Sequence, residues 1–337
     1  MGFRLSIRQQ PTSSGLNGTI HILEGDAGDR AEVWPALGFN CFSWKTVQGG
    51  QTLDLLYADP QLFGDGRPTR SGIPILFPFP NRIRAGRFSW DGRRFQLPQN
   101  DGTRKNAIHG FVCRRPWRLV EQGADAQSAF VTGEFQLSRE DPDSAALWPA
   151  DFLLHVTYRL LRGRLRVEAT VSNPDRLALP FGLGYHPYFC VPLVPGEKPE
   201  ECLIQVPAKS FWMLDETLPT GDKKPVDAAR DFTKPRPFSG VTVDDVLTDI
   251  TSGGPAAPAG LRWNGTMTQG QRKLHFFSSP SFRELVVFVP PHRQAFCLEP
   301  YTCLTDAINL QQRGMDVGWL TLQPGQRWES AFEMGTE

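Results

Sequence analysis

The order of hydrophobic and polar positions predicts a chain built from short β-strands. The clearest alternation covers residues 165–171, in which one parity is apolar and the other polar: Leu165, Val167, Ala169 and Val171 against Arg166, Glu168 and Thr170. A period of two is typical of a strand with one face toward water. Residues 152–161 precede this segment across Arg162-Gly163, so the two together predict a β-hairpin.

Similar short patterns recur along the chain, and they predict further strands at residues 32–44, 129–137, 274–277, 284–289, 295–298, 319–322 and 327–332. Only residues 305–313 predict a helix, with Thr305 or Asp306 as its N-cap and Gly314 just beyond its end. We expect that helix to be a short surface turn. The 32 glycines and 29 prolines would interrupt longer helices repeatedly. Many short strands favour an all-β sandwich or barrel.

No shift of composition and no internal repeat divides the chain, so one large domain over residues 1–337 is the prediction. Residues 253–260 are the most linker-like segment, but more strand-like sequence follows them, so we interpret them as a loop. Residues 195–201 and 214–240 are rich in Pro, Gly and charge. We expect both to be long surface connections that could form the walls of a pocket.

Charge and apolar runs exclude several classes of partner. Lys plus Arg and Asp plus Glu both number 36, so the net charge is zero and neither nucleic acid nor an anionic membrane surface is an expected partner. No apolar run reaches the roughly 20 residues of a membrane span, and no secretion signal is recognisable. We therefore expect a soluble, cytoplasmic protein. The six cysteines form no C-x-x-C pair, which favours reduced core thiols.

Three local phrases carry the candidate chemistry. They are Asn106-Ala-Ile-His109-Gly-Phe111, Gly184-Tyr-His186-Pro-Tyr-Phe189 and Cys297-Leu-Glu299-Pro300. Two histidines and a glutamate can supply a neutral-pH pair of proton donor and acceptor. No G-x-S-x-G elbow, P-loop, dinucleotide fingerprint or H-E-x-x-H pair is present, and His109 with Cys113 lacks the spacing of a zinc site. We therefore expect neither metal nor cofactor.

Several short phrases follow one another in an order that resembles the aldose 1-epimerase (galactose mutarotase) family: Asn81-Arg82-Ile83, Gly86-Arg87-Phe88, Asp91-Gly92, Leu97-Pro98 and Asn106-Ala107-Ile108-His109-Gly110. The resemblance extends over nearly the whole chain. It implies a single large antiparallel β-sandwich of the galactose mutarotase type that acts on a small-molecule aldose without metal or cofactor, as a monomer or homodimer. Departures at residues 77–80 and 184–189 indicate a divergent bacterial branch and leave the sugar open.

The resemblance also implies roles for five residues. Glu299 is expected to be the base at the anomeric hydroxyl, and His186 the acid at the ring oxygen, with the roles exchanged as the ring recloses. Arg82, His109 and Asp244 are expected to hold the sugar hydroxyls and the ring oxygen. For the acid/base pair we expect a carboxylate near its ordinary pKa and an imidazolium that titrates toward neutrality.

Each role has a structural alternative. His186 could be a buried histidine of a tight turn, and Glu299 a charge at the rim of a strand. Arg82 could pair with a surface acid. Asp244 and Asp245 are neighbours, and neighbours on a strand point to opposite faces, so only one can face a sugar. Asp244 fits the family pattern better, and Asp245 is the second choice. Phe189 is the one aromatic residue that we expect in the pocket.

Three functions are compatible with these residues. The first is a mutarotase of a free aldohexose such as glucose or galactose. The second is an epimerase of a hexose 6-phosphate or another anionic sugar, favoured if at least two arginines converge on the pocket; the candidates are Arg67, Arg70, Arg84 and Arg104. The third is a carbohydrate-binding protein without catalysis. A glycosidase would need two carboxylates, which Glu299 and Asp244 could imitate, but His186 favours mutarotation.

Overall fold

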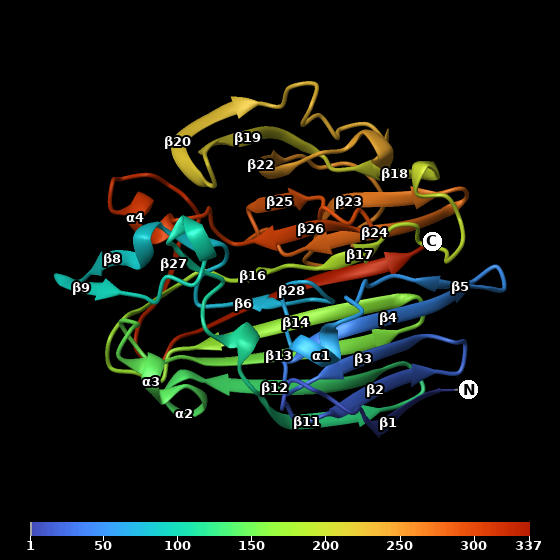
Figure 1. Ribbon diagram of the computed structural model, residues 1–337, viewed down its shortest axis with the longest axis horizontal. Helices are drawn as coiled ribbons and strands as arrows, with labels where there is room; N and C mark the ends of the chain where they lie inside the picture. Colours follow the sequence, from blue (N-terminus) through green and yellow to red (C-terminus); the bar gives the residue numbers. More distant parts are fainter. Residues whose placement is uncertain (1) are drawn as a thin grey trace.

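The alternating segments form three large antiparallel sheets in the computed structural model, which describes residues 2–337 (Figure 1). The nine-stranded sheet has the order β11 (Arg118–Ala124), β12 (Ala129–Gln136), β13 (Leu153–Leu161), β14 (Arg164–Ser172), β28 (Arg327–Thr336), β24 (Arg272–Ser278), β23 (Arg262–Gln269), β18 (Cys202–Gln205) and β21 (Arg236–Pro237). This sheet runs through the middle of the molecule and contains the hairpin that the sequence predicts, because β13 pairs with β14 throughout.

The eight-stranded sheet carries the candidate site residues of the later half of the chain. Its order is β20 (Leu218–Pro225), β19 (Ala208–Asp215), β22 (Asp244–Ile250), β25 (Glu284–Phe288), β26 (Ala295–Tyr301), β16 (Gly184–Tyr185) and β6 (Ile75–Leu76), and β17 (Tyr188–Cys190) also pairs with β26. Every pairing in this sheet is antiparallel. The expected antiparallel β-sandwich is therefore confirmed.

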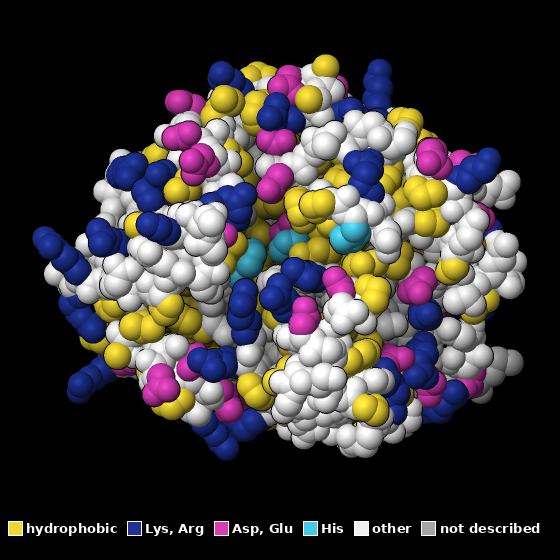
Figure 2. Space-filling view, viewed as in Figure 1, with side chains coloured by type: hydrophobic (Ala, Val, Ile, Leu, Met, Phe, Trp, Pro, Cys, Tyr) yellow, Lys and Arg dark blue, Asp and Glu magenta, His cyan; other side chains and the backbone are white. Residues whose placement is uncertain are grey.

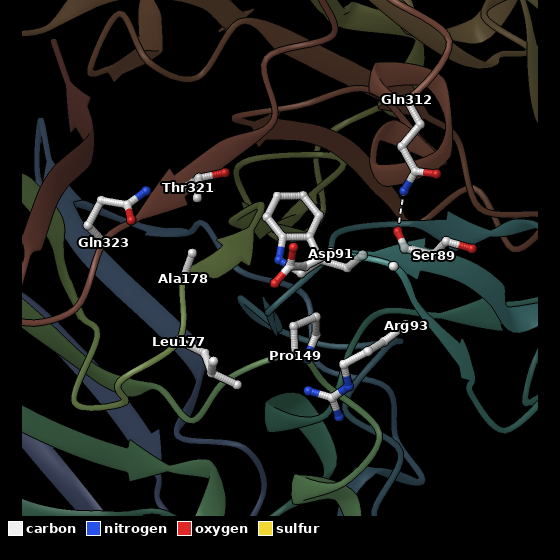
Figure 3. Close-up of a pocket in the computed structure, with 11 residues that line it drawn as sticks. Ser89, Asp91, Arg93, Pro149, Leu177, Ala178, Gln312, Thr321 and Gln323 are labelled. Carbon is white, nitrogen blue, oxygen red and sulfur yellow. Dashed lines mark hydrogen bonds between the residues drawn. The ribbon is translucent and has the colours of Figure 1, made fainter.

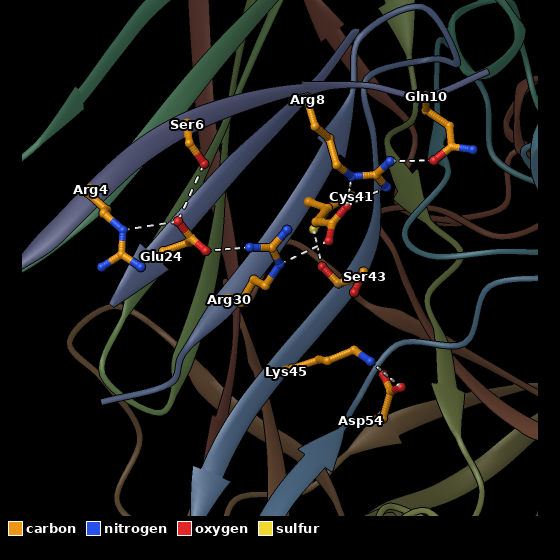
Figure 4. Close-up of polar contacts among 11 residues, drawn as sticks. Arg4, Ser6, Arg8, Gln10, Glu24, Arg30, Cys41, Ser43, Lys45 and Asp54 are labelled. Atoms are coloured by element: carbon orange, nitrogen blue, oxygen red, sulfur yellow. Dashed lines mark hydrogen bonds and ion pairs between the residues drawn. The ribbon is translucent and has the colours of Figure 1, made fainter. Parts of the chain in front are cut away.

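The N-terminal strands form a five-stranded sheet that lies against the nine-stranded one, with β2 in contact with β12 and β13 (Figure 1). Its order is β1 (Phe3–Gln9), β2 (Thr19–Gly25), β3 (Arg30–Trp34), β4 (Asn40–Gln48) and β5 (Gln51–Asp54). Figure 4 shows cross-strand ion pairs on this sheet, including Arg4 with Glu24 at 3.1 Å and Lys45 with Asp54 at 3.0 Å. Such partly exposed pairs mark the face turned to water and add little stability.

Short elements complete the fold. The two-stranded sheets are β7 (Arg82–Ile83) with β10 (Ala107–Ile108), β8 (Arg87–Trp90) with β9 (Arg93–Gln96), and β15 (Leu179–Phe181) with β27 (Leu320–Leu322). The α-helices are α1 (Leu62–Asp65), α2 (Leu137–Glu140), α3 (Pro142–Ala145) and α4 (Ala307–Gln311). The 3-10 turns are η1 (Arg84–Gly86), η2 (Gly102–Arg104), η3 (Val112–Arg114), η4 (Pro199–Glu201) and η5 (Phe238–Gly240). No helix among residues 2–337 is long and apolar enough to cross a bilayer.

One buried cluster connects residues as distant in sequence as Leu23 and Met334. Aromatic rings join the layers within it: the ring centroid of Phe39 lies 5.4 Å from that of Tyr158, and Phe77 meets Phe152 edge-on at 4.6 Å. The core therefore lies between the sheets, while the candidate site residues lie where the eight-stranded sheet meets β7 and β10. That residues 1–337 form a single domain stays a prediction.

Two of the predicted segments differ from the structure. The strand expected at residues 32–44 is wrong as one element, because Pro35 and Gly38 divide it into β3 and β4. The loop expected at residues 214–240 contains strand β20, whose outermost place in the sheet tolerates Pro219 and Pro225.

The helix expected at residues 305–313 forms as α4, with Gly314 beyond it at φ 81°. Asp306 stands in the N-cap position but does not cap the helix. It adopts a left-handed conformation, and its carboxylate accepts the backbone N–H of Arg84 at 3.0 Å. Because Ala307, Ile308 and Leu310 are buried, α4 is not the surface turn that we expected. It anchors the segment that carries Arg82.

Candidate active site

The register of the eight-stranded sheet gathers polar residues on one face. Residues that pair directly across antiparallel strands point to the same side. Asp244 of β22 pairs with Phe288 of β25, and Phe288 pairs with Cys297 of β26. Glu299 and Tyr301 follow Cys297 at steps of two, so they share its face. The sequence thus places a carboxylate of β22 and one of β26 over the same surface.

A gap in the pairing of β26 brings His186 to this surface. On one side β26 is paired continuously with β25, but on the other it pairs with β17 up to Cys297 and with β16 only at Tyr301. The link His186–Pro187 joins β16 to β17 opposite this gap. The backbone N–H of His186 donates to the carbonyl of Pro74 at 3.0 Å, which fixes the link. His186 therefore faces Glu299 across the opening.

The two residues form a close, buried pair. His186 Nε2 lies 3.4 Å from Glu299 Oε1, and the side chains of His186 and Glu299 are only 9% and 2% exposed. A tyrosine touches each partner: the Tyr301 hydroxyl donates to Glu299 Oε2 at 2.5 Å, and the Tyr188 hydroxyl lies 3.3 Å from His186 Nε2. Glu299 is therefore not a charge at the rim of a strand, whereas His186 does lie in a buried link between two strands.

Burial shifts the pKa of both partners toward their neutral forms. Desolvation raises the pKa of Glu299 well above its ordinary value; the Tyr301 hydrogen bond opposes this rise, and the negative charge of Asp244 adds to it. Desolvation, with a smaller contribution from the positive charge of Arg82, lowers the pKa of His186 to about 3. Our expectation of a carboxylate at its ordinary pKa and an imidazolium near neutrality is wrong, because both groups are buried.

A strained turn holds His109 beside His186. His109 has φ 68°, its backbone N–H donates to the carbonyl of Asn81 at 2.8 Å, and its ring centroid lies 5.7 Å from that of His186. Gly110 follows with φ 66°, and a Cβ there would lie 2.0 Å from the carbonyl oxygen of Phe77. Only glycine fits that position. Desolvation and the charges of His186 and Arg82 lower the pKa of His109, so it is a neutral imidazole.

Arg82 is held by a carboxylate that the sequence reasoning missed. Its Nε donates to Asp101 Oδ2 at 2.7 Å, and its side chain is 12% exposed, so it is not part of a solvated strip. Asn81 accepts a further bond from Arg82 Nη1 at 2.9 Å. The Arg82 charge lowers the pKa of His109, His186, Asp244 and Glu299 alike. The other four predicted site residues therefore lie around the Arg82 guanidinium.

Sheet register separates the two neighbouring aspartates. Asp245 points to the opposite face and accepts Arg230 Nε at 2.9 Å. Asp244 is exposed as a residue, yet desolvation is the largest cause of its raised pKa, followed by the opposing charge of Arg82. Both the exposure of the residue and the desolvation of its carboxyl are explained if the Asp244 carboxyl lies on the wall of an open hollow. Asp244 is thus the aspartate on the Glu299 face.

The aromatic residue that we expected in the pocket lies elsewhere. Phe189 is fully buried, and its ring packs 4.5 Å from that of Phe276, so this prediction is wrong. Strand alternation turns Phe189 away from the face that His186 and Tyr188 share. The Tyr188 ring stacks on the His186 ring with the centroids 4.6 Å apart, and the Phe288 ring meets the His186 ring edge-on with the centroids 6.2 Å apart. These two rings form the apolar part of the site.

One group of potential metal donors lies within the site. Donor atoms of His186, Cys297 and Glu299 lie within 4.8 Å of one another. Desolvation, with the charges of Glu299 and Asp244, raises the pKa of the Cys297 thiol well above its ordinary value. A cysteine binds a metal ion as the thiolate, which this raised pKa disfavours. One carboxylate oxygen of Glu299 already accepts the hydrogen bond from the Tyr301 hydroxyl. The group therefore fits proton transfer better than it fits a metal centre.

The site lies at a hollow in the molecular surface. Figure 2 shows histidine side chains inside this hollow, with Lys and Arg side chains around its rim. A second cavity, of about 580 Å³, lies at the β8–β9 hairpin and is shown in Figure 3. Trp90, Arg93, Leu177 and Gln312 are among its lining residues, and none of the five predicted site residues is. It offers no histidine or buried carboxylate for proton transfer.

Comparison with known proteins agrees with this geometry. The family model of aldose 1-epimerase matches residues 40–335. This chain belongs to the aldose 1-epimerase family. The uncharacterized protein YihR of Escherichia coli K12 is 28% identical over 258 residues, which are 75% of each chain. Galactose mutarotase of Sus scrofa is 30% identical over 160 residues, but these are only 46% of this chain and 43% of that protein.

Solved structures share the fold of this family member. A galactose mutarotase-like protein from Clostridium acetobutylicum superposes with a TM-score of 0.85 at 22% identity, over 99% of this chain and 98% of that one. Galactose 1-epimerase from Lactobacillus acidophilus superposes with a TM-score of 0.78 at 19% identity, over 99% of both chains. At these identities the likeness concerns the fold, and the chemistry has to be argued from the residues of this chain.

Proposed function

We propose that this family member is a mutarotase that interconverts the α and β anomers of a free aldohexose. The observation that carries the proposal is the buried pair of His186 Nε2 and Glu299 Oε1 at 3.4 Å, with Arg82, His109 and Asp244 around it. Mutarotation needs one proton acceptor at the anomeric hydroxyl and one proton donor at the ring oxygen. A single carboxylate with a single imidazole meets that need.

The reaction starts with a carboxylate and an imidazolium. Glu299 takes the proton from the anomeric hydroxyl while His186 gives a proton to the ring oxygen, so the C1–O5 bond breaks and an open-chain aldehyde forms. The pair then consists of a carboxylic acid and a neutral imidazole. Rotation about C1–C2 and the reverse proton transfers close the ring as the other anomer. The pair holds one proton throughout, so the cycle balances without exchange with solvent.

The pKa shifts favour the ring-opened half of this cycle. Burial disfavours the charged pair and favours the neutral one, which is the state that accompanies the open-chain sugar. The charge of Arg82 stabilises the Glu299 carboxylate but not the His186 imidazolium. The sugar hydroxyls that enter the hollow offset part of the preference for the neutral pair when the cyclic sugar is bound. Orientation by Arg82, His109 and Asp244 holds the reacting atoms within reach of the pair.

Polarimetry tests the proposal directly. Freshly dissolved α-D-glucose or α-D-galactose should reach rotational equilibrium faster with the protein than without it, in the presence of EDTA. Glu299→Gln keeps the size of the side chain but removes the base, so it should lose about 100-fold or more of the acceleration while still binding sugar. Equal activity of Glu299→Gln and the wild type would rule out this mechanism.

A second candidate substrate class is an anionic aldose. Two of the four arginines that could clamp an anion lie near the site: the charge of Arg70 acts on Tyr188, and that of Arg104 acts on Asp244. Both side chains are about half exposed. Within residues 2–337 the ion pairs of Arg70 and Arg104 are long, at 3.8 Å with Asp65 and 3.9 Å with Asp101. They are therefore available to a phosphate or another anionic group.

A comparison of kcat/KM for two sugars distinguishes the two substrate classes. Glucose 6-phosphate and glucose would be compared as substrates for the wild type and for the double variant R70A/R104A. If the natural sugar is anionic, kcat/KM for the phosphorylated sugar exceeds that for glucose, and the double variant loses this difference. If the natural sugar is neutral, kcat/KM for glucose is at least as high as that for glucose 6-phosphate in both proteins. A protein that binds sugars with no acceleration of either would be a carbohydrate-binding protein.

A further inference from the structure

We propose that Tyr301 is the positioning residue of the acid/base pair: its hydroxyl holds Glu299 Oε2, so that Oε1 alone exchanges protons with the sugar. This inference rests on the proposed mutarotase function. Tyr301 and Glu299 are two residues apart on strand β26 and therefore point to the same face. The hydroxyl of Tyr301 lies 2.5 Å from Oε2, and both side chains are buried.

The geometry assigns different tasks to the two carboxylate oxygens. Oε1 faces His186 Nε2 at 3.4 Å, and Oε2 faces the Tyr301 hydroxyl. A carboxylate on a flexible side chain could otherwise rotate and offer either oxygen. With one oxygen held by a short hydrogen bond, the other is fixed toward the histidine and the hollow. Fixing the base in this way removes a conformational cost from the proton-transfer step.

The fold reserves space for the tyrosine ring. Gly184 of β16 pairs directly with Tyr301, and a Cβ on Gly184 would lie 2.5 Å from Cδ1 of the tyrosine ring. The ring thus lies against a glycine backbone and has no room to move in that direction. The buried phenol is held protonated, because burial and the charge of Glu299 raise the pKa of Tyr301 well above its ordinary value. It therefore remains a donor over the whole working pH range.

The test compares Tyr301→Phe with Tyr185→Phe. The second variant is a matched control, because the Tyr185 hydroxyl is also fully buried, on a neighbouring strand, but has no hydrogen-bond partner among residues 2–337. Phe is nearly isosteric with Tyr in both cases. Tyr301→Phe should lower kcat by about tenfold or more with little change in KM, because a donor to a buried charge is lost. Tyr185→Phe should leave both constants unchanged.

The pH profile distinguishes positioning from a structural role. Loss of the hydrogen bond destabilises the Glu299 carboxylate, so the pair loses its proton only at higher pH and the alkaline limb of kcat moves up by about one pH unit. The acidic limb, where His186 gains a second proton, should stay in place. If Tyr301→Phe retains wild-type kcat and both limbs, the inference is wrong. 3-Fluorotyrosine at position 301 keeps the ring, donates more strongly, and should move the alkaline limb down.

An infrared titration keeps the inference separate from the proposed function. The C=O band of protonated Glu299, assigned by its absence in Glu299→Gln, should disappear at higher pH in Tyr301→Phe than in the wild type. This shift without activity on any sugar would refute the mutarotase proposal but support the Tyr301–Glu299 contact. Activity with no shift of the band or of the alkaline limb would refute the role of Tyr301.

Discussion

Glu284, a buried carboxyl on the strand next to β26, offers a quantitative test of how burial shifts pKa values in this structure. Glu284 of β25 pairs with Tyr301 across the sheet, is 1% exposed, and accepts a hydrogen bond from Trp212 Nε1 at 2.9 Å. Desolvation raises its pKa from 4.5 to about 7, although hydrogen bonds from Thr248 and Trp212 oppose the rise. Replacing it with glutamine keeps the shape and removes the charge.

The expected effect on stability follows from the pKa difference. In the unfolded chain Glu284 loses its proton near pH 4.5, and in the folded protein only near pH 7. Between these values the folded state holds more protons, so the free energy of unfolding falls as the pH rises through this window. A difference of about 2.5 pKa units corresponds to about 3 kcal/mol. Relative to the wild type, Glu284→Gln should therefore gain about 3 kcal/mol between pH 4.5 and pH 8.

Urea unfolding monitored by tryptophan fluorescence at several pH values between 4.5 and 8 measures this gain. The amide adds donors that the site does not satisfy, but that cost is independent of pH, so the slope of the difference is the test. A difference between Glu284→Gln and the wild type that stays constant over this range would refute the reasoning. Mutarotation should persist in the variant, because Glu284 does not touch the acid/base pair.

Other substitutions probe the supports of the site. Asp101→Asn should raise KM about tenfold with a smaller effect on kcat, measured by polarimetry, because the carboxylate that accepts from Arg82 Nε at 2.7 Å loses its negative charge; an unchanged KM would contradict its role. Gly184→Ala should lower kcat, because its Cβ displaces the Tyr301 ring. His186→Asn should fold, by circular dichroism, yet be inactive; an unfolded protein would point to a structural histidine. EDTA should leave the wild-type rate unchanged, and a loss restored by a divalent cation would contradict a metal-free reaction.

Short motifs that follow one another in order carry the five candidate residues, and the roles of these residues stay predictions. The structure brings Arg82 and His109 together through the pairing of β7 with β10, which places Ile108 opposite Arg82. The choice between Asp244 and Asp245 could not be settled from parity alone, since parity says only that they point apart. The register against Phe288 and the ion pair of Asp245 with Arg230 decide it.

Electrostatics of the pair lay beyond sequence reasoning. From sequence alone, a histidine or glutamate can only be assigned its ordinary pKa, because the shift depends on its neighbours in space. Here burial is the largest cause of both pKa shifts. Asp101 was missed for a related reason. It lies 19 residues after Arg82, on a turn between β9 and β10, and no local pattern joins a turn carboxylate to a strand guanidinium.

Sequence reasoning missed Tyr301, the proposed positioning residue, because the predicted strand ended too early. The sequence pattern predicts a strand at residues 295–298, which ends before Glu299. Strand β26 continues to Tyr301, since Pro300 falls in the gap where the partner changes from β17 to β16 and no donor is required on that side. The same gap admits His186. Because β26 extends to Tyr301, Tyr301 lies two residues beyond Glu299 and on the same face. Pro300 lies between them, at the gap where the proposed chemistry takes place.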